Sequence, residues 1–317
     1  MNTNKTVAIL ISLFIVSFTM LGQNKNAEPY DIYDYVGKPK ALADIEGFSK
    51  RSKPIYDIYL QGANIPYGLS KREIFDYFYN PTSNKADGVF IFIHGGYWQG
   101  GLKESYAFVG KWFLENNIDL ILIEYDLTKE NELNGETLPR ATMTAIAGEV
   151  GRALDHIQTF LAKNTRVSPD TPIFLSGHSA GGHLAALHKA HPLINTAIFP
   201  ISGLFDLSPI APTKVIGKAL QLNETEIINL SPIYNINNAI PSSPAIYIYY
   251  GGIEMPELIN QSVNYYNKIK KHGYKTSIQK IEGADHFEIL DQLFNNPSSP
   301  LINEVERYKK EKRKDSY

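Results

Sequence analysis

The stretch "FLSGHSAGGHLAAL", from Phe174 to Leu187, constrains the fold of this chain most strongly. A short apolar run ends in the pentapeptide GHSAG, centred on Ser179, and an Ala- and Leu-rich run follows at once. A G-x-S-x-G pattern between a strand and a helix is typical of a tight turn that thrusts its serine out above a sheet. We therefore expect an exposed, reactive Ser179; the alternative is a turn of small residues with an idle serine.

The rest of the chain alternates between two kinds of pattern. Continuous apolar runs, such as "GVFIFIH" from Gly88 and "IDLILIEY" from Ile118, predict strands buried on both faces. Longer stretches with helical spacing separate them, the longest being "LPRATMTAIAGEVGRALDHIQTFLAKN", with Pro139 expected in its first turn. This alternation predicts an α/β fold: a doubly wound, mostly parallel sheet with helices on both faces.

We expect a single domain over residues 23–317, since no repeat, low-complexity linker or break in composition divides the chain. Weak periodicity in residues 23–70 predicts an irregular N-terminal segment with short helical turns. Residues 204–238 interrupt the strand–helix alternation and are interpreted as an insertion near the active site. Within it, Asn223 followed by Glu226 is typical of a helix N-cap with its capping-box partner.

Residues 1–22 have the order of regions of a secretory signal peptide: one lysine, an apolar stretch from Val7 to Leu21, then small and polar residues. This stretch of fifteen residues is short for crossing a hydrocarbon core of about 30 Å. We therefore expect export to the periplasm or the medium, with a bare membrane anchor as the alternative.

The overall charge and the cysteine count exclude several classes of function. The net charge of −2 and the pI of about 6.5 argue against a nucleic-acid partner, and against a membrane role beyond export. The basic C-terminal run from Arg307 is expected to be the solvated end of a helix. Because the chain has no cysteine, it has no disulfide, no thiolate nucleophile and no cysteine-ligated metal.

A serine hydroxyl needs a base to take its proton, so one of the eight histidines must serve Ser179. His286 follows "KIEGAD" at the exit of the last predicted strand, where the base belongs in a nucleophile–acid–base chain order. His178 and His183 are interpreted as local packing and hydrogen-bonding residues. His188 and His191 have a spacing that could grip a metal, but they lack a carboxylate partner, so no metal site is predicted.

The third catalytic group must be a carboxylate that orients the imidazole of the base. Asp206 is interpreted as a turn residue, and Asp285 adjoins His286 and would point elsewhere. Glu254 and Glu257 both lie just beyond "AIYIYYGG", the carboxyl end of a predicted strand, where sites gather in open sheets. Glu254, in the loop, is favoured over Glu257, which falls in the first helical turn.

The stretch "IHGGYWQGG" supplies the other half of the expected site. Gly95 and Gly96 follow the strand that ends at His94, and their lack of side chains lets backbone N–H groups approach a substrate oxyanion. The N–H of Ala180, at the start of a helix, is the second expected donor. His94 is expected to brace the turn.

The aromatic pair Tyr97 and Trp98 follows those glycines and is expected to form a substrate-binding wall. Packing of the loop against the N-terminal segment is the alternative interpretation for this pair. For Trp98 the sequence favours neither interpretation over the other.

These stretches resemble the kynurenine formamidase (arylformamidase) group of α/β-hydrolases, related to the esterases of the hormone-sensitive-lipase type. The similarity runs from about Ile65 to Leu290 through "IHGGYWQGGLKESY", "SGHSAGGHLA", "ISGLFDLSPI" and "GADHFEIL". It implies the α/β-hydrolase fold, no cofactor, and the catalytic roles already assigned. Tyr97 stands where the broader esterase group usually has a third glycine, and the family often has aspartate where Glu254 stands.

We therefore expect a serine hydrolase that cleaves a formamide or ester bond of a small molecule through an acyl-enzyme. The resemblance implies an arylformamidase acting on a substrate of the N-formylkynurenine type. A general short-chain carboxylesterase is the alternative, because an exported relative of a cytoplasmic enzyme can have another substrate. A non-catalytic binding protein on a hydrolase scaffold is the remote third possibility.

Overall fold

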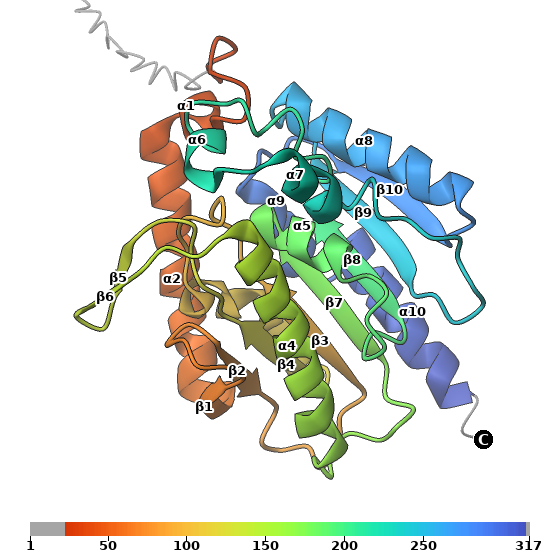
Figure 1. Cartoon of the computed structure of the whole chain (residues 1–317). Helices are drawn as coiled ribbons and strands as arrows, with labels where there is room; N and C mark the ends of the chain where they lie inside the picture. The colour runs from red at the N-terminus through yellow and green to blue at the C-terminus, as the bar shows by residue number, and fades with distance from the viewer. Residues whose placement is uncertain (1–22, 315–317) are drawn as a thin grey trace, which may run out of the picture.

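A computed structural model describes residues 23–314, and these form an eight-stranded sheet with helices on both faces (Figure 1). The strand order is β1-β2-β4-β3-β7-β8-β9-β10. The pairs β1–β2 and β2–β4 are antiparallel, and every other neighbouring pair is parallel. The predicted doubly wound, mostly parallel sheet is therefore confirmed. The predicted signal peptide lies outside the described residues, and export stays a prediction.

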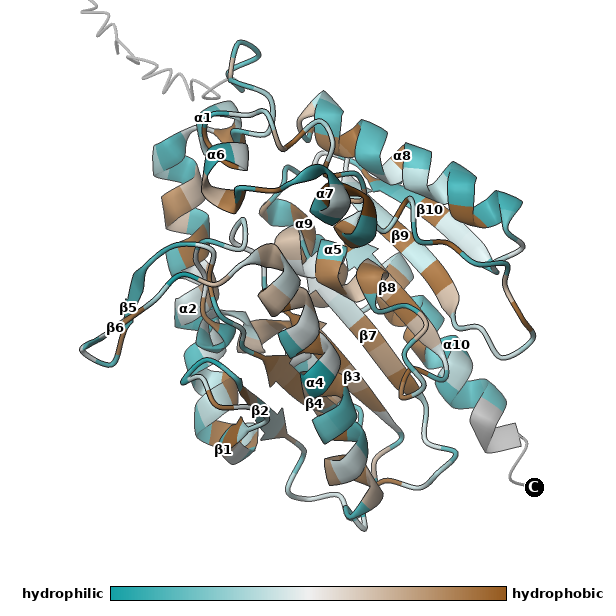
Figure 2. Ribbon diagram, in the orientation of Figure 1, coloured by the Kyte–Doolittle hydropathy of each residue, from teal (hydrophilic) through white to brown (hydrophobic). Residues whose placement is uncertain are grey.

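The apolar runs of the sequence become the central strands. β3, β4, β7 and β8 are buried along their whole length, as the brown middle of the sheet in Figure 2 shows. The strands of the main sheet are β1 (Leu60–Pro66), β2 (Ile74–Phe78), β3 (Gly88–Ile93), β4 (Ile118–Ile123), β7 (Ile173–His178), β8 (Ala197–Ile201), β9 (Ala245–Gly251) and β10 (Thr276–Ile281). A separate hairpin pairs β5 (Asn131–Leu133) with β6 (Glu136–Leu138).

Helices cover both faces of this sheet: α4, α5 and α8 lie over one, and α2, α9 and α10 over the other (Figure 1). The 3-10 helix η1 packs between α2 and α9. The helices are α1 (Ile32–Val36), α2 (Lys38–Tyr59), η1 (Lys103–Gly110), α3 (Lys111–Glu115), α4 (Met143–Ala162), α5 (Ala180–Leu187), α6 (Gly217–Leu220), α7 (Glu224–Leu230), α8 (Pro256–Lys271), α9 (Glu288–Phe294) and α10 (Pro300–Lys314). Among residues 23–314, none of the helices combines the length and the apolar character that crossing a bilayer requires.

Aromatic packing ties the layers together beneath β3. The ring of Phe90 lies 4.2 Å from that of Phe113 on α3, 6.0 Å from Phe294 on α9 and 6.1 Å from Phe199 on β8. All four side chains are buried. Because large aromatic side chains contribute most of the apolar area in a core, this cluster anchors the strand that leads into the glycine-rich loop.

The N-terminal segment differs from its prediction. Residues 23–70 were expected to be irregular, yet they contain α1, the 22-residue helix α2, and β1. The apolar periodicity of α2 is weak, because few of its positions are buried. Pro54, inside the helix, is a further signal against a helix in the sequence. The contact that holds it is tertiary: Phe48 stacks on Phe108 of η1 with ring centres 4.9 Å apart.

Two helix starts show how capping sets a boundary. The helix predicted from Pro139 begins only at Met143, because Thr142 is its N-cap and its Oγ1 accepts from the N–H of Ala145 at 3.1 Å. The capping box predicted for Asn223 and Glu226 is confirmed at the start of α7.

The insertion, residues 204–238, carries α6 and α7 and contacts the helix that follows Ser179. The imidazole Nε2 of His183 lies 2.7 Å from Leu230 O. Farther along, the ammonium of Lys189 donates to Asn235 O at 2.5 Å. Lys189 is only 4% exposed, and its burial lowers the pKa to about 8 from an ordinary value of 10.5.

This lowered pKa gives a testable pH dependence of stability. Between pH 8 and 10.5 the unfolded chain binds the Lys189 proton more tightly than the folded one, so stability should rise with pH in that window. At pH 7 the buried charge is a cost, and Lys189→Met should raise the free energy of unfolding there by up to about 3 kcal/mol. Urea denaturation at pH 7 and pH 10.5 measures this, with the exposed Lys268→Met on α8 as control. A K189M variant less stable than wild type at pH 7 would contradict the prediction.

Candidate active site

The predicted strand-to-helix turn is present at Ser179. β7 ends at His178 and α5 begins at Ala180, so Ser179 alone makes the turn, with φ +56° and ψ −118°. This backbone conformation is strained for a residue with a side chain, and such strain gathers at functional sites. The flanking glycines are required by space: a Cβ on Gly177 would lie 2.2 Å from Gly181 O, and one on Gly181 would lie 2.0 Å from Ile93 O.

The structure brings two of the other predicted catalytic residues together. His286, in the loop between β10 and α9, places its Nδ1 3.0 Å from Oε1 of Glu254, in the loop between β9 and α8. Both side chains are buried. Because the carboxylate can only accept, Nδ1 carries the imidazole proton, and Nε2 is left free to act as a base. His286 and Ser179 line the same cavity.

The other carboxylates have different partners. Glu257 lies in the first turn of α8, half-buried, and lines a separate pocket with Tyr30. Asp285 pairs with Lys40 at 2.7 Å and accepts from the backbone N–H of Phe287. Asp206 accepts from the N–H of Ser208 at 2.8 Å, within its own turn. Of Glu254 and Glu257, only Glu254 contacts the predicted base.

The glycine-rich loop packs directly on the turn at Ser179. A Cβ on Gly95 would lie 3.2 Å from Cβ of Ser179, and one on Gly96, where φ is +120°, would lie 2.2 Å from Gly100 O. Both glycines line the cavity. The Gly95 N–H is directed at the hydroxyl of Tyr106. The Ala180 N–H is the first of α5 and therefore has no partner within the helix.

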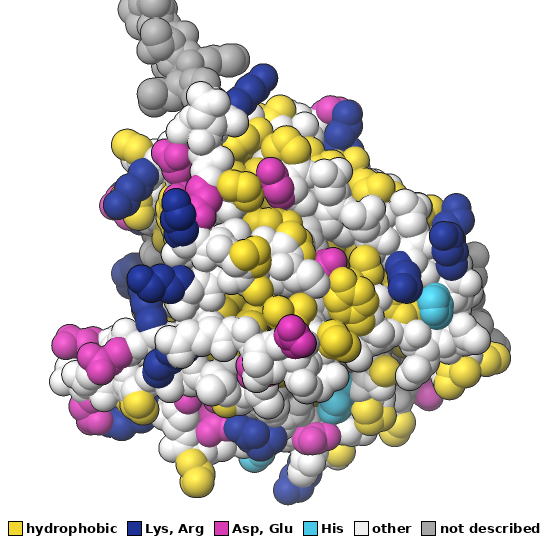
Figure 3. Space-filling view, turned by 45° about the horizontal axis from the view of Figure 1, so that its top comes forward, with side chains coloured by type: hydrophobic (Ala, Val, Ile, Leu, Met, Phe, Trp, Pro, Cys, Tyr) yellow, Lys and Arg dark blue, Asp and Glu magenta, His cyan; other side chains and the backbone are white. Residues whose placement is uncertain are grey.

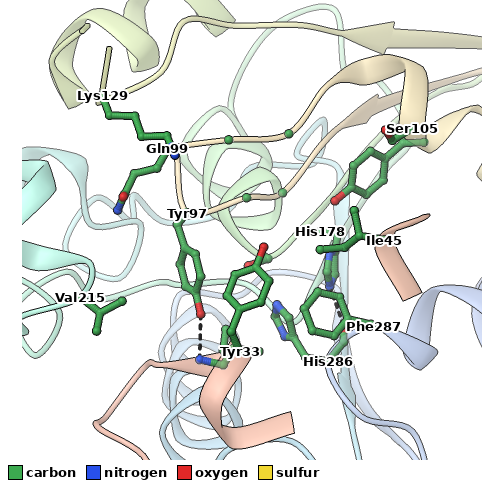
Figure 4. Close-up of a pocket in the computed structure, with 17 residues that line it drawn as sticks. Tyr33, Ile45, Tyr97, Gln99, Ser105, Lys129, His178, Val215, His286 and Phe287 are labelled. Carbon is green, nitrogen blue, oxygen red and sulfur yellow. Dashed lines mark hydrogen bonds between the residues drawn. The ribbon is translucent and has the colours of Figure 1, made fainter. Parts of the chain in front are cut away.

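The cavity in front of Ser179 has a volume of about 310 Å³ and is largely apolar (Figure 4). Aromatic rings from four segments surround it, and Lys129 and Gln99 lie at one side. The aromatic lining residues are Tyr33, Tyr97, Tyr106 and Phe287. Hydrophobic side chains also gather on the outer face above this end of the sheet (Figure 3). Flat, apolar groups would fit such a cavity.

Tyr97 lines the cavity, whereas Trp98 is buried behind it. The ring of Tyr97 lines the cavity, and its hydroxyl accepts from the N–H of Ile32 at 2.8 Å and donates to Tyr30 O at 3.0 Å. Trp98 is fully buried, lies outside the lining of the cavity and packs edge-on against His183, with ring centres 4.9 Å apart. Trp98 therefore packs inside the fold on α5, and its side chain is too deep to touch a substrate. The predicted packing of the loop against the N-terminal segment is made by Tyr97 instead.

The N-terminal segment contributes residues to the site that the sequence analysis did not identify. Tyr33 on α1 lies between Tyr97 and Phe287, with ring centres 5.8 Å and 6.0 Å away. The Tyr35 hydroxyl donates to Glu254 O at 3.3 Å. The tyrosine-rich stretch "YDIYDY" was the available signal, but its tertiary partners are distant in sequence.

His178, beside the serine, stays neutral. Its burial lowers the pKa well below the usual value, and the neighbouring His286 lowers it further. Its Nε2 donates to His286 O at 2.8 Å, and the two rings are 4.6 Å apart. The neutral ring therefore supports the loop of the base and adds no competing charge.

The remaining histidines near α5 have ordinary structural partners. Nε2 of His188 lies 2.9 Å from Ala147 O. Nε2 of His191 lies 3.2 Å from Oδ1 of Asp155, so this histidine has a carboxylate partner, which the sequence analysis did not expect. Within residues 23–314, no group of three or more ligand-type side chains is arranged to hold a metal ion.

Comparisons with known proteins find chains that are similar in sequence and in fold. Residues 75–196 match the family model described as BD-FAE. The chain is 29% identical to a kynurenine formamidase of Salmo salar over 73% of this chain and 76% of that one, and 28% identical to one of Danio rerio over the same shares. A Silicibacter protein described as a thioesterase has a crystal structure that superposes with a TM-score of 0.68, at 23% identity, over 87% of this chain and 97% of that one. The truncated form of a carbohydrate esterase from gut microbiota superposes with a TM-score of 0.63, at 19% identity, over 80% and 97%.

The sheet order, the turn at Ser179 and the structural neighbours define the α/β-hydrolase fold. Together with the similarity to the kynurenine formamidases over most of the chain, this makes the chain an enzyme of the hydrolase class. Within that class it is an arylformamidase-like α/β-hydrolase, similar to the kynurenine formamidases over most of its length.

Proposed function

We propose that the chain is a serine hydrolase in which Ser179 is the nucleophile, His286 the base and Glu254 the acid. The observation that carries the proposal is the 3.0 Å contact of His286 Nδ1 with Glu254 in the cavity that Ser179 lines. The contact fixes the tautomer and stabilises the imidazolium that forms when Nε2 takes a proton.

The reaction follows from these positions. Nε2 of His286 takes the Ser179 hydroxyl proton as the oxygen attacks the carbonyl carbon, and the N–H groups of Gly96 and Ala180 hold the oxyanion. The imidazolium then gives its proton to the leaving amine or alcohol as that bond breaks. Water attacks the acyl-enzyme in the second half, again losing its proton to His286, and the acid product leaves as Ser179 is reprotonated.

We propose a formamide on an aromatic ring as the preferred substrate, of the N-formylkynurenine type. Two observations support this: the aromatic lining of the cavity, and the similarity to relatives named kynurenine formamidases. A short-chain carboxylesterase is the second candidate. Similarity to a rice protein described as a probable isoprenylcysteine α-carbonyl methylesterase, at 20% identity, favours it.

A matched pair of substrates separates the two candidates. We expect kcat/KM on N-formylkynurenine to exceed that on p-nitrophenyl acetate, once each value is divided by the uncatalysed rate, because the aromatic walls would hold the aryl ring in place. Absorbance assays with the purified protein measure both values. Hydrolysis of the ester alone would select the carboxylesterase, and no hydrolysis of either would favour a non-catalytic protein.

The acid of the triad can be tested against its neighbour. Glu254→Gln preserves the shape but removes the charge opposite His286, so kcat should fall by about 10³-fold or more with little change in KM. Glu257→Gln, in the first turn of α8, should keep kcat within about twofold of the wild-type value, because Glu257 has no contact with the reacting groups. Steady-state kinetics with circular dichroism to verify folding measure this; the reverse ranking of the two variants would reassign the acid.

A further inference from the structure

His94, which ends β3, makes two hydrogen bonds whose partners are both acceptors. Its Nδ1 lies 2.8 Å from Gly95 O, and its Nε2 lies 3.0 Å from Oε1 of Glu124. A carbonyl oxygen can only accept, and so can an ionised carboxylate. With Glu124 ionised, each ring nitrogen faces an acceptor, and an imidazolium, which carries a proton on both nitrogens, would satisfy the two contacts.

The surroundings of Glu124 favour its ionised form. Its carboxylate also accepts from Arg72 Nη1 at 2.6 Å, from the N–H of Lys103 at 2.8 Å and from the N–H of Tyr125 at 3.2 Å. Burial by itself raises the pKa of Glu124, but the charges and hydrogen bonds of His94, Arg72 and the Lys103 backbone outweigh it and hold the pKa below its usual value.

Aromatic rings complete the environment of His94. The ring of Tyr125 stacks on the imidazole, with ring centres 4.3 Å apart and an interplanar angle of 10°. The ring centre of Tyr106 is 6.0 Å from that of the imidazole. The face of a tyrosine ring attracts a cation. A protonated His94 would share the carboxylate of Glu124 with Arg72, and the stacked aromatic rings would add to its stabilisation at a place removed from water.

The bond to Gly95 O sets the direction of the next N–H. In a trans peptide the C=O of Gly95 and the N–H of Gly96 point to opposite sides. The Gly95 oxygen faces His94 and the underside of the loop, where a Cβ on Gly101 would lie 2.5 Å from it. The Gly96 N–H is therefore turned away from His94, toward the cavity that Gly96 lines, and within the described part of the chain it donates to no protein acceptor.

We propose that His94 is a positioning residue, a buried imidazolium that shares the carboxylate of Glu124 with Arg72, and that it orients the Gly95–Gly96 peptide so that the Gly96 N–H meets the oxyanion. The inference deepens the proposed function and rests on it for its kinetic consequence. A fixed positive charge behind that peptide stabilises the full negative charge of the tetrahedral intermediate more than the partial charge of the ground-state carbonyl. His94 acts through Gly96 and touches no reacting atom.

The charge of His94 can be observed without any substrate. In protein labelled with ¹⁵N-histidine at pH 7.5, we expect both ring nitrogens of His94 to show imidazolium shifts, each with an attached proton. In Glu124→Gln the ring should lose one proton and show the two unequal shifts of a neutral tautomer. A neutral His94 in the wild type would overturn the proposal, whatever the enzyme hydrolyses.

Kinetic variants test the orienting role. His94→Phe removes both the charge and the donor, and kcat should fall by about 10²–10³-fold while KM changes little, the size expected for losing one oxyanion donor. His94→Asn restores a neutral donor near the place of Nδ1 and should recover part of that loss. The affinity for a trifluoromethyl ketone, which forms an oxyanion on the serine, should fall in parallel with kcat/KM.

His188→Gln is the matched control, because it alters another histidine whose Nε2 bonds a backbone carbonyl, that of Ala147 on α4, away from the loop. It should keep kcat within about twofold of wild type. Full activity in His94→Asn would show that the charge is not needed and would overturn the proposal, as would an unchanged affinity of His94→Phe for the ketone. If the wild-type protein hydrolysed none of the substrates, this would count against the proposed function, and the NMR result on His94 would be unaffected.

Discussion

The close approach of two backbones, at Gly181 and Ile93, is the contact on which the site depends. A side chain at Gly181 would lie 2.0 Å from Ile93 O, so only glycine lets α5 start this near the end of β3. Because β3 and β7 are neighbours in the sheet, the approach sets Ser179 beside the glycine-rich loop. Glu254 and His286 come from the ends of β9 and β10, at the same edge of the sheet. Parallel strand order thereby gathers four loops that are far apart in sequence.

Buried charge holds the loop between His94 and Lys103 in a conformation that the backbone disfavours. Tyr97 and Trp98 both have positive φ, at +58° and +56°, in the loop between His94 and Lys103. One carboxylate, that of Glu124, contacts both ends of that loop, through the ring of His94 and the N–H of Lys103. Strained turns persist only where their surroundings determine them, and a buried carboxylate with several donors provides such a surrounding.

Local patterns were enough to predict the central strands and the turn at Ser179, because uninterrupted apolar runs and a glycine-flanked serine have few alternative structures. The preference for Glu254 over Glu257 followed from its place just past a strand, and the structure brings it to His286. The length of α2 could not be predicted, since its periodicity is weak and Pro54 is a signal against a helix, whereas the packing on η1 that holds it is tertiary. The burial of Trp98 and the part of Tyr33 in the cavity depend on tertiary contacts that no local pattern contains.

If Ser179 is the nucleophile proposed above, it forms a covalent bond to the acyl group of the substrate. Reaction with a fluorophosphonate, followed by mass spectrometry of the peptides, tests it directly, because such probes trap an activated serine. We predict one adduct per chain, on the peptide that carries Ser179, and none in Ser179→Ala, which should also lose hydrolysis. An adduct on a different serine, or undiminished hydrolysis by Ser179→Ala, would contradict the assignment of Ser179 as the nucleophile.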